Sequence, residues 1–526
     1  MSRLLRSSAV ISAMTMVSRV LGLARDAIIF NYFPAGGALD AFFVAFRIPN
    51  LLRRMVAEGA FSLAFVPVLS EYKESKSPED LQKLLNHVAG TLSLILLAIT
   101  VVGMIAAPLL AMVFAPGFLI GAASEVNTEQ HALTSSLLLI TFPYIFLISL
   151  SAFVGAILNT FQKFAVPAFT PVLLNVVLIA AAIWGAPLFD EPVTALAWGV
   201  VIGGFAQLLF QIPSLIKLGL LPKPNFSRGH EGVKRIMKLM LPTLLGSSVA
   251  QINILINTAI ASLLAVGSIS WLYASDRFVE LPLAIIGVAI GVVILPKLSG
   301  DHVKSEGKAF SETLDWAVRI GLLMALPAMV GLILLAKPIL STVLGNGVNG
   351  WQLVEMAGLS LSAYALGLPA FILVKVLAPG FYSRQDTATP VKIGLIAVVS
   401  NIVLSALIVY PWYQLGYVGP HAGLALATAL AGYINAGLLF YQLKKQAVFH
   451  TVSARLWLKD MGRIVLSVTV MGLLIFWLSP ADTWWQAAGL ASKVGHLIAL
   501  IVLALMTYFS LLFVMGVRKQ HLLPEN

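Results

Sequence analysis

Apolar segments of about 20 residues recur along the whole chain, and each is long enough to cross the hydrocarbon core of a bilayer as a helix. Of the 526 residues, 59% are hydrophobic and 11% are charged, whereas a soluble domain carries about a quarter charged residues. The mean hydropathy is +0.93. These features predict an all-α polytopic membrane protein.

We predict fourteen membrane-spanning helices from these segments. The first contains Arg19 and is not followed by a clear small-residue cleavage site, so we interpret it as an uncleaved helix rather than a signal peptide. The fourteen expected spans lie near residues 8–30, 38–70, 86–114, 132–157, 165–186, 192–216, 239–264, 270–296, 311–336, 353–382, 390–410, 421–443, 456–478 and 485–516.

The lysines and arginines are divided unevenly between the two sets of loops that these spans define. Of the 34 in the chain, 24 lie at the N-terminus, in or beside every second loop, or in the C-terminal tail. Eight lie deeper within spans, and Lys337 and Lys493 lie in or beside the other loops. Because cytoplasmic loops carry the excess of basic residues, we expect both termini to be cytoplasmic. The net charge of +11 is then mainly a topology signal, with contacts to anionic membrane lipids, and does not indicate nucleic-acid binding.

Short sequences recur at similar offsets in the two halves of the chain. "AFSLAFVPVLS" at 60–70 matches "AIGVVILPKLS" at 289–299, and "LNTFQKFAVP" at 158–167 parallels "FYSRQDTATP" at 381–390. A third pair is "RLLR" and "RIMK", and the three offsets are 229, 223 and 232 residues. Similar helix-end chemistry could produce one such match, but three similar offsets in one order indicate an internal duplication.

The duplication predicts a particular domain organisation. Each half contains six spans, an even number, so both halves enter the membrane in the same direction. We therefore expect two six-helix lobes related by a parallel pseudo-two-fold repeat, with a shared site at their interface near the middle of the membrane. The expected N-lobe is 1–222, the C-lobe is 223–450, and residues 451–526 add two C-terminal helices.

Eight cations lie within the expected spans. Each arginine near the bilayer centre costs about 2.5–3.5 kcal/mol on insertion scales, so these side chains must face water, one another or a polar partner. Arg319 and Lys375 are expected near helix ends or in local pairs. The full set is Arg19, Arg25, Arg47, Arg53, Arg54, Arg277, Arg319 and Lys375.

Polar residues follow one face of the second span. Three of them recur every seven residues, and the others lie at steps of three and four, which is the spacing of one helix face. The residues of this face are Asp40, Arg47, Asn50, Arg54 and Glu58.

The first span has a similar arrangement in "SRVLGLARD". Ser18 lies on the same face as Arg25, and Arg19 on the same face as Asp26, because both pairs are seven residues apart. Gly22 lies between the two arginines, at a position where bending the helix is least costly. We therefore predict a hinge at Gly22, although close packing on a neighbouring helix would also explain this glycine.

In the eighth span, "SDRFVELP" places Asp276 and Arg277 one turn before Glu280. In the second span, Arg53 lies about 100° around the helix from Arg54 and flanks its polar face. Local ion pairs and snorkelling would account for single residues of this kind. The whole set fits better with charged faces turned toward a central cavity.

Arginines outnumber acids in these three spans, by six to five. The arginine fork matches phosphate oxygens bidentately. A cationic cavity within the membrane therefore predicts an anionic substrate and favours a phosphate.

Several other kinds of site are excluded or weakly supported by the sequence. The chain has no cysteine, so it has neither disulfides nor thiolate metal sites. It lacks the G-x-x-x-x-G-K-[ST] pattern of a nucleotide-binding loop, and its eight histidines do not show the H-E-x-x-H spacing of a zinc enzyme. We expect no metal site, no cofactor and no enzymatic activity, and the coupling ion or energy source is undefined.

The motifs above resemble those of the MurJ (MviN) family of lipid II flippases, within the multidrug/oligosaccharidyl-lipid/polysaccharide exporter superfamily. The similar sequences are "SRVLGLARD", "DAFFVAFRIPNLLRRMVAEGAFSLAFVP", "SDRFVELP" and "KVLAPGFYSRQDTATPVK", and they extend the resemblance over essentially the whole chain. Leu63 replaces a glutamine of the family pattern.

The resemblance implies transport of lipid II, the undecaprenyl-diphosphate-linked disaccharide-pentapeptide, from the cytoplasmic to the periplasmic leaflet of the bacterial inner membrane. It implies alternating access, a role in peptidoglycan synthesis, cell wall biogenesis and cell shape, contact with the peptidoglycan synthesis machinery, and a lipid groove on the two C-terminal helices. By motif position, the cavity arginines of the family fall on Arg19, Arg25, Arg53 and Arg277, and its functional acids on Asp40 and Glu58. We add Arg54, Asn50 and Ser18 to the expected substrate-binding residues.

Three alternatives remain at this stage. An exporter of another polyprenyl-linked glycan would have the same charged cavity. A membrane enzyme acting on a prenyl diphosphate would need a cluster of acids for magnesium, which the sequence does not show. An anion channel would not explain the duplicated architecture.

Overall fold

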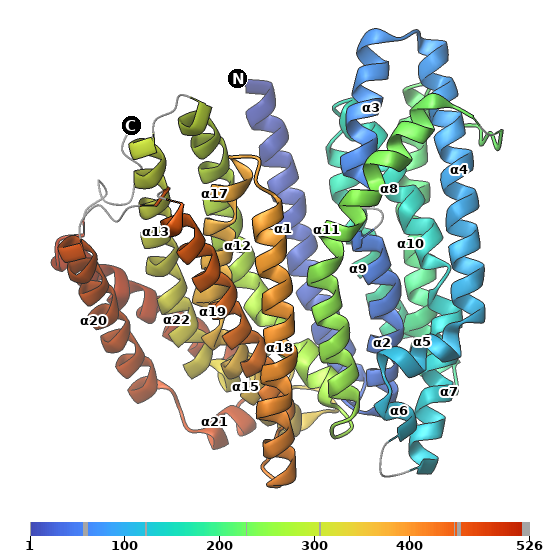
Figure 1. Ribbon diagram of the computed structural model, residues 1–526. Coiled ribbons are helices and arrows are strands. Elements are labelled where there is room, and N and C mark those ends of the chain that lie inside the picture. Colours follow the sequence, from blue (N-terminus) through green and yellow to red (C-terminus); the bar gives the residue numbers. More distant parts are fainter. Residues whose placement is uncertain are drawn as a thin grey trace. The chain divides into compact units, whose positions relative to one another are not determined.

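The computed structural model describes residues 2–55, 61–120, 124–227, 229–303, 307–446, 448–449 and 454–517. In these ranges the chain forms helices and no β-strand (Figure 1). It divides into two compact units, Met1–Ser270 and Trp271–Asn526. This division by contacts differs from the expected boundary at residue 222, which rests on sequence repetition and stays a prediction.

Within the first unit, α1 packs on α9, α10 packs on both α8 and α9, α2 on α7, and α11 on α3. A π-helical turn at Ala181–Gly185 and a 3₁₀ turn at Ala186–Leu188 extend α9. The α-helices of this unit are α1 (Ser2–Tyr32), α2 (Gly37–Leu52), α3 (Ser62–Ser75), α4 (Pro78–Ile105), α5 (Ala107–Phe114), α6 (Gly117–Ile120), α7 (Ser124–Thr141), α8 (Tyr144–Thr160), α9 (Ala165–Ala180), α10 (Val193–Lys217) and α11 (Glu231–Ser262).

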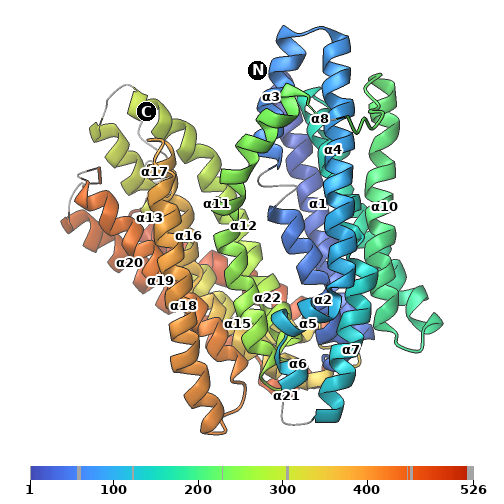
Figure 2. The ribbon, with the colours of Figure 1, turned by 45° about the vertical axis from the view of Figure 1, so that its right-hand side comes forward.

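Within the second unit, α18 and α15 both pack on α19, α13 packs on α16, and α20 packs on α22 (Figure 2). Helix α12 begins in the last three residues of the first unit and continues into the second. The helices are α12 (Ser268–Val303), α13 (Gly307–Leu334), α14 (Ala336–Val343), α15 (Gly350–Leu366), α16 (Leu368–Leu377), α17 (Pro379–Tyr382), α18 (Ala388–Gln414), α19 (His421–Lys445), α20 (Ala454–Leu478), α21 (Asp482–Ala487) and α22 (Leu490–Val514).

The sequence explains where several of these helices begin and end. Ser77 caps α4 by accepting a hydrogen bond from the backbone N–H of Asp80, and Pro78 occupies the first helical position, where its missing N–H is no loss. Prolines accompany breaks within two expected spans: Pro143 lies between α7 and α8, and Pro369 lies in the first turn of α16, directly after the break from α15. Proline cannot donate the backbone hydrogen bond that would continue the helix.

Ten helical segments among the described residues are long and apolar enough to cross a membrane. They overlap ten of the fourteen spans expected from the sequence, namely Pro78–Ile105, Thr128–Thr160, Ala165–Leu188, Val193–Lys217, Gly307–Leu334, Gly350–Tyr382, Ala388–Gln414, His421–Lys445, Trp457–Leu478 and Leu490–Val514. The chain is therefore a multi-pass membrane protein, as predicted.

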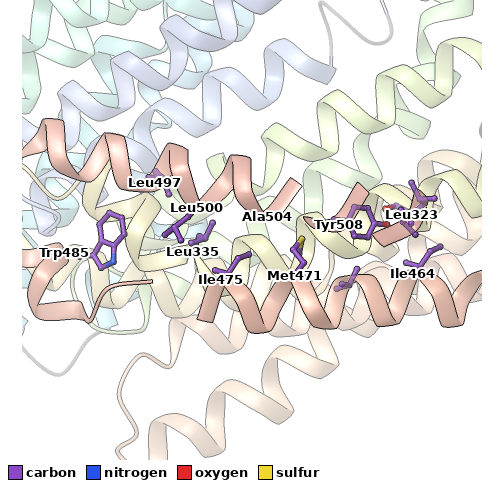
Figure 3. Packing of buried hydrophobic residues seen from close by; sticks show 12 residues of the cluster. Leu323, Leu335, Ile464, Met471, Ile475, Trp485, Leu497, Leu500, Ala504 and Tyr508 are labelled. Carbon is purple, nitrogen blue, oxygen red and sulfur yellow. Dashed lines mark hydrogen bonds between the residues drawn. The ribbon is translucent and has the colours of Figure 1, made fainter. Parts of the chain in front are cut away.

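A buried apolar cluster holds the C-terminal helices together in the second unit (Figure 3). Ile475 and Met471 of α20 point toward α22, the helix that carries Leu500 and Ala504. The hydroxyl of Tyr508 in α22 donates to the backbone carbonyl of Leu323 in α13, at 2.6 Å. These contacts bind the pair α20–α22 to α13.

The segment between α10 and α11, described over residues 218–227 and 229–230, lies against α4 in the first unit. The backbone N–H of Asn225 donates to the carbonyl of Asn86, at 2.9 Å, and the backbone N–H of Lys223 donates to the side-chain oxygen of Asn86, at 2.7 Å. A Cβ atom on Gly90 would lie 2.1 Å from the carbonyl oxygen of Asn225. Only glycine permits so close an approach, so this segment is seated on α4 by its backbone.

Candidate functional site

Arg25 is the most deeply buried of the predicted site arginines that the structure describes. Its side chain is 5% exposed, and its Nε and Nη2 atoms donate to Oδ1 of Asp26, at 2.9 and 2.5 Å. Its Nη1 atom donates to Oδ1 of Asn175 in α9, at 3.1 Å. A buried guanidinium requires such partners, because an unpaired charge is strongly disfavoured away from water. The acid beside it in sequence supplies the balancing charge.

Asn175 also contacts α1 one turn before Gly22. Its amide nitrogen donates to the backbone carbonyl of Ser18, at 3.1 Å. Arg19, the next residue, is exposed. The two arginines of "SRVLGLARD" thus have different surroundings, since Arg25 is enclosed within the first unit and Arg19 is not.

The expected polar face of the second span does not form one continuous surface. Asp40 is 2% exposed and accepts hydrogen bonds at the start of α12, from Gly267 and Ser270. Arg47 donates to the hydroxyl of Thr258 in α11, at 2.6 Å. The face is therefore divided among different neighbours along its length.

At the other end of this face, Arg53 and not Arg54 bonds Asn50. The Nε atom of Arg53 donates to Oδ1 of Asn50, at 2.9 Å, and Arg53 is partly buried while Arg54 is exposed. The helix has π-helical geometry over residues 53–55, which changes the angular spacing of side chains from that of an α-helix. Glu58 lies outside the described residues.

In the second unit, Arg277 belongs to α12 and contacts Glu280 one turn later. Its Nη1 atom lies 3.3 Å from Oε2 of Glu280, and its guanidinium lies 5.5 Å from the ring centre of Tyr273. The side chains of Arg277 and Glu280 are 31% and 41% exposed. The local pair considered as an alternative for "SDRFVELP" is present, and part of the guanidinium is exposed beside it.

A second charged group joins α13 to α20. Arg319 contacts Asp315 through Nε and Asp460 through Nη1, each at 2.8 Å. Arg463 contacts the other oxygen of Asp460 at 3.3 Å, and the indole of Trp457 donates to Asp315 at 2.8 Å. The local pairing expected for Arg319 is confirmed, but its partner across the helices was not predicted.

The residues that sequence reasoning missed are uncharged or distant partners of predicted ones. Asn175, Thr258 and Ser270 each bond a predicted site residue or its backbone. Asn175 gives a weak signal, since it interrupts the apolar "PVLLNVVLIA". In the part of the chain that the structure describes, no three His, Asp or Glu side chains are grouped so that they could hold a metal ion.

Comparison with known proteins assigns the chain to a family. The family model described as "Lipid II flippase MurJ" matches residues 29–494. The chain belongs to the MurJ family of lipid II flippases. The resemblance found in the motifs is thereby confirmed, and a MurJ family member is a transporter rather than an enzyme.

Relatives in the MurJ family match along almost their whole length. The "Probable lipid II flippase MurJ" of Vibrio cholerae serotype O1 is 44% identical over 521 residues, which cover 99% of this chain and 98% of that protein. The "Lipid II flippase MurJ" of Burkholderia cenocepacia is 38% identical over 522 residues, which cover 98% of each.

Solved structures agree with the MurJ assignment. A structure of lipid II flippase MurJ in an inward closed conformation has a TM-score of 0.77 and 30% identity, and the match covers 96% of this chain and 99% of that one. An inward-facing multidrug resistance MATE family transporter of the MOP superfamily has a TM-score of 0.66 at 16% identity, covering 84% of this chain and 98% of that one. The second likeness shows that the MATE transporters share the fold.

Proposed function

We propose that this protein carries lipid II from the cytoplasmic to the periplasmic leaflet of the bacterial inner membrane by alternating access. The observation that carries the proposal is the family match over residues 29–494. The lipid would supply peptidoglycan synthesis, so membrane lipids and the peptidoglycan synthesis machinery are its expected surroundings. The proposed mechanism requires no cofactor. Its energy source would be the membrane potential or the gradient of a monovalent cation.

The proposed architecture has fourteen spans in two parallel six-helix lobes, 1–222 and 223–450, with two C-terminal helices in 451–526. Ten spans meet the length and hydropathy requirements by themselves. The other four correspond to α1, to α2 with α3, to α11 and to α12. Three of these four carry the ionisable residues of the proposed site, which lowers their hydropathy.

The proposed orientation has both termini in the cytoplasm, and single cysteines test it because the parent chain has none. Val348 is 61% exposed in an expected periplasmic loop, and Phe226 is 62% exposed in an expected cytoplasmic one. A cysteine at Val348 should react with an impermeant thiol reagent added to intact cells, and one at Phe226 only after lysis. Reaction of the Phe226 variant in intact cells would overturn the orientation.

The proposed substrate site binds the diphosphate through Arg19, Arg25, Arg53 and Arg277. The support is chemical: guanidinium forks match phosphate oxygens, and these cations lie on helices of a membrane protein where each needs a polar partner. The proposed site is completed by Asp40, Asn50, Arg54, Glu58 and Ser18. In the described state Arg25 is held by Asp26, so binding would exchange that acid for phosphate oxygens.

Reconstituted vesicles test the function directly. Fluorescent lipid II in the inner leaflet should become accessible to an impermeant quencher only when the protein is present, and should stop doing so with alanine at Arg53. Native mass spectrometry should find lipid II with the purified protein. If lipid II does not move but another polyprenyl-linked glycan does, the alternative cargo is correct.

A further inference from the structure

One side chain, Asn175 of α9, bonds α1 on both sides of Gly22. Its Oδ1 atom accepts from Nη1 of Arg25, and its Nδ2 atom donates to the carbonyl of Ser18, both at 3.1 Å. Asn175 is 6% exposed, and α9 packs along α1. A Cβ atom on Gly22 would lie 3.8 Å from the same Nδ2 atom. The amide of Asn175 therefore spans the two turns between which the hinge is predicted.

The bond to Ser18 is not needed to satisfy the backbone of α1. In a regular α-helix the carbonyl of Ser18 already accepts from the N–H of Gly22, four residues later. Asn175 uses the second lone pair of that oxygen. Burying an amide without hydrogen-bond partners is unfavourable, and a leucine at this position of an apolar helix would avoid that cost. The folding of α9 therefore does not explain the amide, whereas its bonds to Arg25 and Ser18 do.

The bond to Arg25 fixes the direction of the guanidinium. One oxygen of Asp26 accepts hydrogen bonds from Nε and Nη2 of Arg25, and the side-chain oxygen of Asn175 accepts from Nη1. Asp26 neutralises the charge, whereas Asn175 adds a neutral acceptor from another helix. Arg25 cannot turn toward a new anion without leaving at least one of these acceptors.

We infer that Asn175 is a positioning residue that couples the direction of the Arg25 guanidinium to the straightness of α1. While Asn175 holds both Ser18 and Arg25, the two turns around Gly22 stay in line, and bending α1 requires release of the Ser18 carbonyl. This inference deepens the proposed function and rests on it for the identity of the cargo. The link between Asn175, Arg25 and the shape of α1 does not depend on the cargo.

The first test measures the shape of α1 without cargo. Met16 and Tyr32 are 58% and 54% exposed on either side of Gly22, and spin labels can be attached at both because the chain has no cysteine. A straight helix separates them by about 24 Å along its axis. Pulsed electron paramagnetic resonance should show one distance near this value, and Asn175→Ala should add a shorter component. An unchanged distribution in Asn175→Ala would overturn the inference.

The second test asks whether Asn175 and Arg25 are coupled energetically. Asn175→Ala and Arg25→Ala should each lower the Tm of the purified protein, and the double variant should lower it by less than the sum, because the two side chains interact. Asn401 of α18 is a matched control, since it is also buried and bonds Thr428 in another helix. Asn401→Ala should be additive with Arg25→Ala. Additivity for Asn175→Ala as well would overturn the inference.

The third test uses the cargo. Asn175→Asp keeps an acceptor for Arg25 and adds a charge that competes with phosphate, but it removes the donor to Ser18. We expect its apparent affinity for lipid II to fall about tenfold, whereas Asn401→Ala should leave affinity unchanged. Unchanged affinity in Asn175→Asp would contradict the link to Arg25. If the unsubstituted protein binds no lipid II, the proposed function fails, and the first two tests still decide the role of Asn175.

Discussion

Asp40 of α2 and Ser270 of α12 are joined by two hydrogen bonds to a single carboxylate oxygen. Oδ1 of Asp40 accepts from the backbone N–H of Ser270 at 2.8 Å and from its hydroxyl at 2.5 Å, while Oδ2 accepts from the N–H of Gly267 at 2.7 Å. The first turn of α12 contains no acidic residue of its own. Asp40 therefore caps the N-terminus of α12 from another helix, where a negative charge is stabilised by the positive end of the helix dipole.

Asp40→Asn should destabilise this end of α12. Asparagine offers one oxygen where the carboxylate offers two, so its NH2 group would face a backbone donor. Leaving a buried donor unsatisfied costs about 1–3 kcal/mol, which should appear as a lower Tm of the purified protein. The control is Asp80→Asn at the exposed start of α4, where water can replace the lost contact. A similar decrease in both variants would argue against a special role for the Asp40 cap.

Arg53 should require its planar guanidinium and not only its charge. Its Nε atom donates to Asn50, and the planar guanidinium also carries two terminal nitrogens of the kind that pair with phosphate oxygens. Lysine has a single nitrogen, which cannot bond Asn50 and also present a planar pair of donors to phosphate. Arg53→Lys should therefore transport lipid II about tenfold more slowly, and Arg53→Ala should abolish transport. Initial rates in vesicles measure this. Arg235→Ala, which removes an exposed pair with Glu71, should keep its rate. Full activity in Arg53→Lys would show that charge alone suffices.

The sequence predicted the helical membrane fold and the family, because both depend on features spread over many residues. Ten of the expected spans were located by apolar length alone. The sequence also raised local pairing as an alternative for Arg277 and for Arg319, and the structure has Arg277 beside Glu280 and Arg319 beside Asp315, each about one turn apart.

Contacts between helices far apart in the sequence were not predictable from periodicity. Asp40 was placed on one face with Arg54, yet it bonds Ser270, 230 residues away, while Arg54 is exposed. The π-helical geometry at 53–55 also changes the angular spacing of the side chains there, and nothing in the sequence indicates it. Spacing assigns a residue to a helix face, but it does not show which neighbour that face meets.

Asp460→Asn should loosen the attachment of α20 to α13. Asp460 bonds both Arg319 and Arg463, and removing its charge leaves two partly buried arginines with less compensation. Breaking such a pair costs up to about 3–5 kcal/mol when it is fully buried, and less here because Asp460 is 27% exposed. We expect a lower Tm. The control is Asp482→Asn, which removes the more exposed pair with Lys337. An equal effect of the two substitutions would contradict this account.

Acidification should release the segment 218–230 from α4. Burial, and secondarily the nearby His87, lower the pKa of His230 below its ordinary value of 6.5, against the opposing charges of Glu231 and Asp80. The Nδ1 atom of His230 caps α11 by accepting from the N–H of Gly232, and a protonated ring cannot accept. In the conformation with the segment bound to α4, His230 holds its proton less tightly than it does when the segment is released. The contribution of the neutral ring to binding is therefore fully present above pH 6.5 and is lost as the pH falls below that value.

Hydrogen-exchange protection of residues 218–230 should therefore decrease between pH 7.5 and pH 5.5, after correction for intrinsic rates. In His230→Asn the side-chain oxygen preserves the cap without a titrating ring, so protection should vary much less with pH. If this variant kept the same pH dependence, another group would be responsible.

Gly22→Ala should fold normally but slow transport. The space around Gly22 decides between its two explanations. Among the side chains that the structure describes, a Cβ atom there would meet Nδ2 of Asn175 and no other group within 4 Å, and that distance of 3.8 Å is an ordinary van der Waals contact. Close packing on a neighbouring helix therefore does not require glycine in the described state. The hinge explanation does require it, because alanine favours a straight helix by about 1 kcal/mol over glycine.

A difference of about 1 kcal/mol corresponds to a factor of about five in the population of bent α1. We expect transport by Gly22→Ala to fall by a similar factor, with membrane insertion and Tm unchanged or slightly raised. Crosslinking of cysteine pairs on the periplasmic ends of the two lobes should show a shift toward one facing state. Gly22→Val adds bulk as well as stiffness and should be more damaging. Normal transport by Gly22→Ala, with the same ratio of crosslinked states, would remove the hinge and leave Gly22 without a role in the transport cycle.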